Sequence, residues 1–103
     1  MSTSSHYWAD LSTRDFSALQ ASGDAARTIA VLPVAATEQH GPHLPLSVDT
    51  VLVDGIVAAA LPYLATDAQV LFLPTQAIGL SPEHQCFPGT LTLKNETILR
   101  LWT

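Results

Sequence analysis

The chain has 103 residues, with 4 Lys plus Arg against 9 Asp plus Glu and a formal net charge of −5. This acidic balance argues against a nucleic-acid partner, because phosphate backbones are bound through basic faces. Hydrophobic residues make up 48% and charged residues 13% of the chain. These values exclude a disordered chain and predict one modest core or part of a larger one, with further surface buried against something else.

The sequence gives no sign of a membrane or secretory segment. The longest apolar stretch, residues 51–65, is interrupted by Asp54 and Pro62 and is shorter than the roughly 18 residues that suggest a membrane span. The N-terminus lacks the basic and apolar regions of a signal peptide. Cys86 is the only cysteine, so no internal disulfide is possible. We therefore expect a cytoplasmic protein without a membrane partner, in which Cys86 is a small, partly buried side chain rather than a nucleophile.

The first predicted elements are a helix and a strand. Ser12 is a suitable N-cap and Asp15 favours the positive helix end, which predicts a short helix to about residue 21 or 22, before Gly23. The apolar, β-branched run over residues 28–36 is typical of a parallel strand buried on both faces. Pro33 predicts an irregular or edge-like end to this strand.

A second helix and strand complete one repeating unit of an α/β fold. A helix is expected from Asp49 to about Leu61, with so wide an apolar surface that it predicts packing on more than one side. Residues 69–74 are expected to form a second buried strand. Strand, helix and strand together predict a right-handed βαβ unit.

The last part of the sequence begins with a long loop, residues 75–90, whose length indicates a functional role. Residues 91–93 are expected to add a short strand, and Asn95 to cap a final helix that is unfinished at Thr103. Two strands are too few for a complete α/β sheet, which usually needs four or more.

Three residues form a candidate metal site. Glu38 and His40 follow the first predicted strand at its carboxyl end, where open α/β sheets bind ligands. In extended backbone, residues two apart point to the same side, so both side chains can converge on one point. Asp49 follows a turn stiffened by Pro42 and Pro45. One imidazole and two carboxylates make a partial ligand set for Zn²⁺ or Mn²⁺.

Structural alternatives exist for these polar residues. Asp49 also suits the N-cap of the second helix. His43 and His84, taken singly, are typical of histidines that are hydrogen-bonded for structural reasons. Glu38 is harder to explain structurally, because a carboxylate directly after a buried strand must find a partner or reach solvent.

Two blocks resemble one known family. The segment Glu-Gln-His-Gly-Pro-His-Leu-Pro-Leu at residues 38–46, within the block 32–49, resembles the signature of the creatininase family of metal-dependent amidohydrolases. A second block, residues 79–93, is similar to the downstream loop of that family. The resemblance covers residues 8–103. It implies a creatininase-like, flavodoxin-like α/β three-layer sandwich with a mainly parallel sheet, of which residues 1–103 are the N-terminal part and the C-terminal part is absent.

The resemblance also implies roles for individual residues. Asp49 would bridge two divalent metals, Zn²⁺ or Mn²⁺, while Glu38 binds one metal and His40 the other. A water activated by both metals would attack the amide carbon. Ser81 and His84 would support the site or face the substrate. The remaining ligands, a His and a Glu, would come from a part of the family fold that the sequence does not contain.

The complete protein would hydrolyse a non-peptide C–N bond in a small-molecule amide and form a homo-oligomer, a hexamer in relatives. The alternative is a truncated, noncatalytic remnant of the family that acts as a binding or assembly module. A nucleotide-binding flavodoxin-like domain lacks support, because no Gly-rich phosphate loop follows either predicted strand.

Overall fold

The computed structural model describes residues 5–103; residues 1–4, part of the N-terminus in which we find no signal-peptide pattern, lie outside the described residues. The chain divides into two compact units. The first contains the N-terminal segment up to Pro33 together with residues 58–74. The second contains residues 34–57 and 75–103, and it holds all the predicted site residues.

Helix α1, Thr13–Ala21, begins and ends where the sequence predicts. The Asp15 backbone N–H donates to the Ser12 hydroxyl, and the Ser12 backbone N–H donates to the Asp15 carboxylate at 2.8 Å. This reciprocal capping box satisfies two backbone donors of the helix entry. The predicted N-cap is therefore confirmed.

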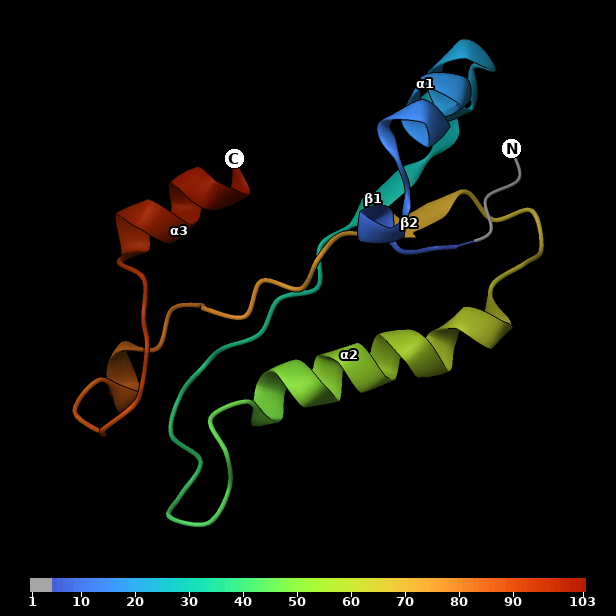
Figure 1. The fold of residues 1–103 in the computed structure, drawn as a ribbon. Coiled ribbons are helices and arrows are strands. Elements are labelled where there is room, and N and C mark those ends of the chain that lie inside the picture. The colour runs from blue at the N-terminus through green and yellow to red at the C-terminus, as the bar shows by residue number, and fades with distance from the viewer. Residues whose placement is uncertain (1–4) are drawn as a thin grey trace. The chain divides into compact units, whose positions relative to one another are not determined.

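Strands β1, Ile29–Val31, and β2, Val70–Phe72, pair in parallel, with Ile29 opposite Val70 (Figure 1). The predicted parallel pair is confirmed, although both strands are shorter than the apolar runs. Pro33 lies two residues after the end of β1 and cannot donate to a sheet ladder, which agrees with the expected irregular end. Burial of β1 on both faces is wrong, since Ile29 is 61% exposed, whereas Leu71 of β2 is fully buried.

Helix α2, Val48–Ala60, agrees with the prediction within one residue at each end, and a 3₁₀ turn, Leu61–Tyr63, follows it. Its apolar surface is mostly uncovered: Val57 is buried, but Leu52 and Ile56 are 59% and 67% exposed. The expected packing of α2 on more than one side is therefore wrong for the described residues. Among residues 5–103, no helix has the length and apolar character to cross a membrane.

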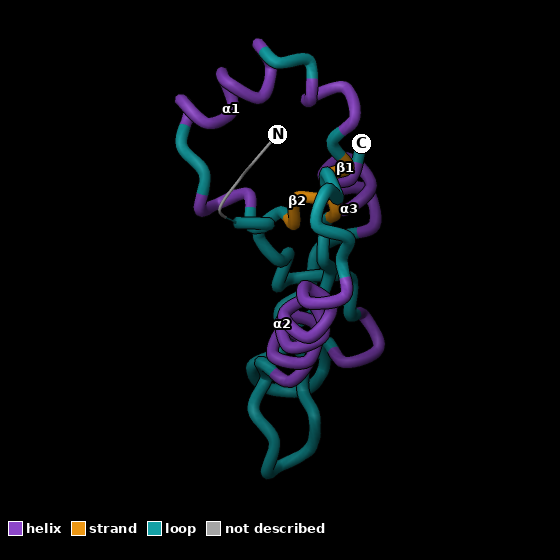
Figure 2. Tube along the Cα trace, turned by 90° about the vertical axis from the view of Figure 1, so that its right-hand side faces the viewer, coloured by secondary structure: helices purple, strands orange, loops and turns teal. Residues whose placement is uncertain are grey.

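The C-terminal part of the second unit consists mainly of loops, apart from α3, Asn95–Trp102 (Figure 2). Lys94 is the N-cap of α3 and Asn95 its first helical residue, so the predicted Asn95 cap is wrong. Leu91 makes one isolated antiparallel bridge with Thr37, in place of the short strand expected at residues 91–93. The long loop contains a 3₁₀ turn, Pro82–His84, and leaves Cys86 exposed rather than partly buried.

Candidate metal centre

The site is built on three loop segments of the second unit, residues 34–39, 76–81 and 90–93. Hydrogen bonds connect these segments to one another. The Ala35 N–H donates to the Gln76 carbonyl, the Leu91 N–H to the Thr37 carbonyl, and the Leu93 N–H to the Gly79 carbonyl, each at 2.9 Å. The hydroxyl of Thr37 also donates to the Ala77 carbonyl at 2.7 Å. These bonds fix the backbone that leads into Glu38.

Gly79 allows two of these segments to approach closely. A Cβ atom at this position would lie 2.7 Å from the Ala35 carbonyl oxygen, closer than a real Cβ contact. A side chain here would therefore separate the segment that carries Glu38 from the one that leads to His84.

The structure brings the predicted ligands Glu38, His40 and Asp49 together. One ligand atom from each lies within 4.8 Å of the others, and all three residues are partly buried. Glu38 and His40 lie on the loop after β1, and Asp49 lies in the first turn of α2. One imidazole and two carboxylates within this span suit a divalent cation, so the donor set fits the metal that the sequence predicts.

The hydrogen bonds of His40 leave one ring nitrogen free for a metal. Nδ1 lies 3.0 Å from the Glu38 backbone carbonyl, which can only accept, so Nδ1 carries a proton. In the neutral ring, Nε2 then has a lone pair, and it lies 3.2 Å from Asp49 Oδ1. The bond to the Glu38 carbonyl and the nearby Asp49 carboxylate raise the pKa of His40 above its ordinary value, because both favour the protonated ring.

Asp49 does not occupy the N-cap position of α2. The helix begins at Val48, and the Val51 N–H donates to the Ser47 carbonyl at 2.9 Å. Asp49 is thus inside the first turn, where a carboxylate interacts favourably with the helix dipole. Its side chain faces His40, which favours ligation over the capping alternative.

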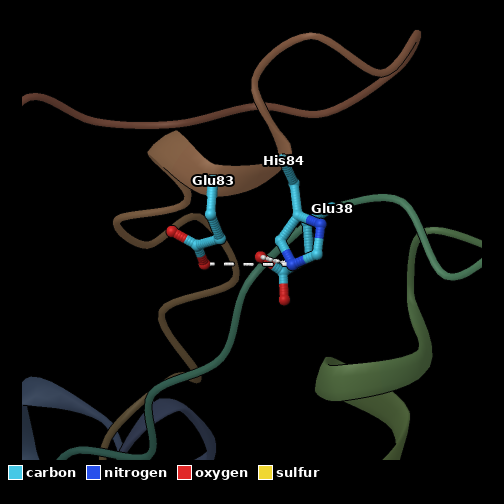
Figure 3. A group of neighbouring side chains, drawn as sticks. All are labelled: Glu38, Glu83 and His84. Carbon is cyan, nitrogen blue, oxygen red and sulfur yellow. Dashed lines mark ion pairs between the residues drawn. The ribbon is translucent and has the colours of Figure 1, made fainter.

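A second group combines Glu38 with Glu83 and His84 (Figure 3). Nε2 of His84 lies 3.8 Å from Glu38 Oε2 and 3.9 Å from Glu83 Oε1. Figure 3 shows one ring nitrogen of His84 directed toward both carboxylates, with Glu83 and His84 on the short 3₁₀ turn. The sequence interpretation did not include Glu83 among the candidate site residues. Its position next to His84 in the sequence was the signal that could have indicated it.

The remaining candidates lie in different environments. Ser81 is fully buried, and its Oγ has no hydrogen-bond partner among residues 5–103. His84 is 29% exposed at its side chain and contacts Gln39, whose side chain lies 2.8 Å away. His43 is exposed, and no hydrogen bond within residues 5–103 involves its side chain. The structural role proposed as an alternative for His43 therefore gains no support.

A cavity of about 490 Å³ in the second unit adjoins two carboxylates of the candidate metal centre. Glu38 and Asp49 contribute to its wall, and most of the other lining side chains are apolar. Three of these, Leu52, Ile56 and Trp102, are themselves more than half exposed. The carboxylates thus lie at the border of a largely apolar surface.

Comparison with known proteins establishes the family of the chain. The family model described as creatinine amidohydrolase (Creatininase) matches residues 9–103. The chain belongs to the creatininase family. Its solved structural neighbours include a creatininase variant described as Zn-Zn type, with a TM-score of 0.71, 28% identity and coverage of 93% of this chain and 36% of that one. This likeness confirms the α/β class and the incomplete creatininase-like fold.

Curated relatives in the family are somewhat more similar in sequence. The mycofactocin precursor peptide peptidase of Mycobacterium tuberculosis is 39% identical over 77 residues, which are 69% of this chain and 31% of that protein. The namesake enzyme of Mycolicibacterium smegmatis is 38% identical over 65 residues, 61% of this chain and 26% of that protein. The creatininase-family chain described here thus spans about a third or less of the length of these relatives.

Proposed function

We propose that this chain supplies Glu38, His40 and Asp49 as divalent-metal ligands to an amide-hydrolysing centre. The single observation that carries the proposal is the convergence of one atom from each residue within 4.8 Å. Family membership supports it independently. Asp49, which faces His40 from the start of α2, is proposed as the ligand shared by two ions.

The proposed cofactor is Zn²⁺ or Mn²⁺, bound in a pair. Zinc is favoured by the imidazole and by the structural neighbour described as Zn-Zn type. A divalent cation, when bound, lowers the pKa of its water and polarises an amide carbonyl. The chain's own residues contribute a neutral Nε2 from His40 and negative charge from the two carboxylates, which offsets the charge of the ions.

The proposed substrate is a small molecule that contains an amide or another non-peptide C–N bond. The likeness to creatininases supports this class. A second candidate, an amide bond in a peptide-derived substrate, is favoured by the higher identity to the mycofactocin precursor peptide peptidases. Ser81 and His84 are proposed to support the site.

Metal titration of the purified chain tests the metal site directly. Calorimetry with ZnCl₂ and with MnCl₂ is expected to show binding that His40→Ala and Asp49→Ala remove and that His43→Ala keeps. Binding that survives in both ligand variants would refute the assignment. Hydrolytic ring opening of creatinine and release of a free amine from a short peptide, each followed with the metal-loaded chain, then test hydrolysis and separate the two substrate candidates.

Metal binding without hydrolysis of either substrate would favour the alternative function, a noncatalytic binding or assembly module. The chain corresponds to 36% of the creatininase chain that it matches. By the same comparison, we propose that the chain forms the N-terminal part of a single creatininase-like domain.

We also propose homo-oligomerisation, supported by the exposed apolar side chains of α2 and α3. Light scattering coupled to size exclusion tests it. A cytoplasmic location is proposed because Cys86 is an exposed free thiol, which a reducing compartment preserves.

A further inference from the structure

The hydrogen bonds around Gln39 determine which nitrogen of His84 carries a proton. The Gly41 backbone N–H donates to Gln39 Oε1 at 2.9 Å, and a backbone N–H can only donate. This bond identifies which atom of the Gln39 side-chain amide is the oxygen, so the other atom, Nε2, is the amide donor. That amide nitrogen lies 2.8 Å from His84 Nδ1, which must accept. The proton of the neutral His84 ring therefore resides on Nε2.

This tautomer is opposite to that of His40. The bond to the Glu38 backbone carbonyl places the His40 proton on Nδ1 and leaves Nε2 free to bind a cation. His84 instead presents an N–H at Nε2, which can donate but cannot coordinate a metal in that form. The group of Glu38, Glu83 and His84 is consequently a poor metal site, although its ligand atoms lie as close together as those of the first group.

The two carboxylates that face this N–H differ in solvent exposure. The Glu38 side chain is 15% exposed and the Glu83 side chain 64%. Solvent weakens the interaction with Glu83 more strongly, because exposed ion pairs are screened. The separation of 3.8 Å between His84 Nε2 and Glu38 Oε2 suits an electrostatic contact or a single bridging water.

We propose that Gln39 and His84 form a relay that positions the Glu38 carboxylate for metal binding, with Gln39 fixing the ring and the Nε2–H of His84 holding one carboxylate oxygen. This inference rests on the proposed function, since it gives His84 a positioning role in the same centre. Partners that orient a ligand in this way typically change metal affinity by about 10- to 100-fold when they are removed. Thr90 supports the relay, because its hydroxyl accepts from the Gln39 backbone N–H at 3.1 Å.

The tautomer can be measured without metal or substrate. Nitrogen-15 NMR of the neutral His84 ring is expected to show the proton on Nε2 in the parent chain. Gln39→Glu keeps an acceptor for the Gly41 N–H but removes the amide donor, so the ring proton is expected to move to Nδ1. A parent ring protonated at Nδ1 would overturn the inference.

Zn²⁺ affinity provides the second measurement. His84→Leu is expected to weaken binding by about 10- to 100-fold, whereas His84→Gln, which restores an N–H donor at similar reach, recovers part of the loss. The matched control is Glu83→Gln, expected to stay within about twofold because the carboxylate is solvent-screened. Complete loss of Zn²⁺ binding in both His84→Leu and Glu83→Gln would show that His84 and Glu83 are ligands, and this would refute the positioning role. Unchanged Zn²⁺ affinity in His84→Leu would also refute it.

The two proposals fail in different ways. A parent chain that binds neither Zn²⁺ nor Mn²⁺ would refute the proposed metal site, and the NMR measurement alone would then decide the relay. A chain that binds metal but carries the His84 proton on Nδ1 would refute the relay and keep the metal site. Circular dichroism of each variant separates both outcomes from a loss of folding.

Discussion

Nε2 of His40 lies 3.2 Å from Oδ1 of Asp49, and this contact joins the loop after β1 to the first turn of α2. The contact distinguishes the two roles considered for Asp49. For a ligand, Asp49→Asn is expected to weaken Zn²⁺ binding by about tenfold or more, because charge and an acceptor oxygen are lost. For a cap, Asn would serve about as well as Asp, so both Zn²⁺ binding and folding stability would stay nearly unchanged. Calorimetry combined with urea denaturation of one variant measures both quantities.

A pH dependence follows from the raised pKa of His40. The folded protein holds this proton more tightly than the unfolded chain, so the contribution of the His40 contacts to stability is complete below the unfolded value of about 6.5 and is lost as pH rises through the folded pKa. Metal binding has the opposite trend, because the ion must replace the proton on Nε2. Zn²⁺ affinity is therefore expected to rise through the folded pKa and then level off.

Calorimetry between about pH 6 and pH 8.5 measures this rise, and proton NMR of the His40 ring locates the folded pKa, expected above the ordinary value of about 6.5. His43→Ala is the control and should leave the profile unchanged, since His43 is exposed. A His40 ring that titrates below the ordinary value would contradict the expectation.

Gly79 and Gly55 provide a matched pair of substitutions. Gly79→Ala would place a Cβ 2.7 Å from the Ala35 carbonyl oxygen, and such overpacking is expected to cost about 1–3 kcal/mol of stability. Gly55 lies within α2, where a Cβ meets no atom within 4 Å. Gly55→Ala is therefore expected to stabilise the chain by about 0.5–1 kcal/mol.

Urea denaturation of both variants checks the sign of each change. Zn²⁺ affinity should fall in Gly79→Ala and remain constant in Gly55→Ala, because of these two glycines only Gly79 lies against the segment that leads into Glu38. Equal stability of the two variants would show that the approach of Gly79 to Ala35 does not constrain this part of the fold.

The exposed face of α2 predicts self-association. Leu52 and Ile56, one helical turn apart, are both more than half exposed and lie on the same side of the helix. Replacing both with Ser is expected to lower the mass measured by light scattering and the fluorescence of a bound apolar dye. Ala59→Ser, on an exposed position of the same helix, is the control. A monomeric parent chain would contradict this prediction.

Local signals in the sequence were sufficient for several elements. Ser12 and Asp15 predict the start of α1 because a capping box depends on residues within one turn. The convergence of Glu38 and His40 follows from their spacing after a strand. The short loop between His40 and α2 then brings Asp49 near these two residues. The parallel pairing of β1 with β2 also follows from the order of the apolar runs.

Other features depend on residues distant in sequence. The apolar pattern indicates that Ile29 can be buried, but its actual exposure depends on whether another part of the fold covers that face of the strand. Asn95 is a good cap by type, yet the hydrogen bond from Leu93 to Gly79 fixes the chain just before the helix, which starts with Lys94 as the cap. The His84 relay could not be predicted, because it requires the side-chain amide of Gln39 to meet a ring 45 positions later.

The contact between His40 and Asp49 closes a short segment that contains Gly41 in a left-handed conformation and two prolines. An ion held by both residues would act as a cross-link across this segment, and the short length of the closed loop keeps the entropy lost on closure small. Ligation would then raise the free energy needed to open the start of α2. At ion concentrations well above the dissociation constant, this increase would grow with the logarithm of the ratio of the two. The same atoms that bind the metal would thereby couple its concentration to the local unfolding of the loop and to its protection from proteases.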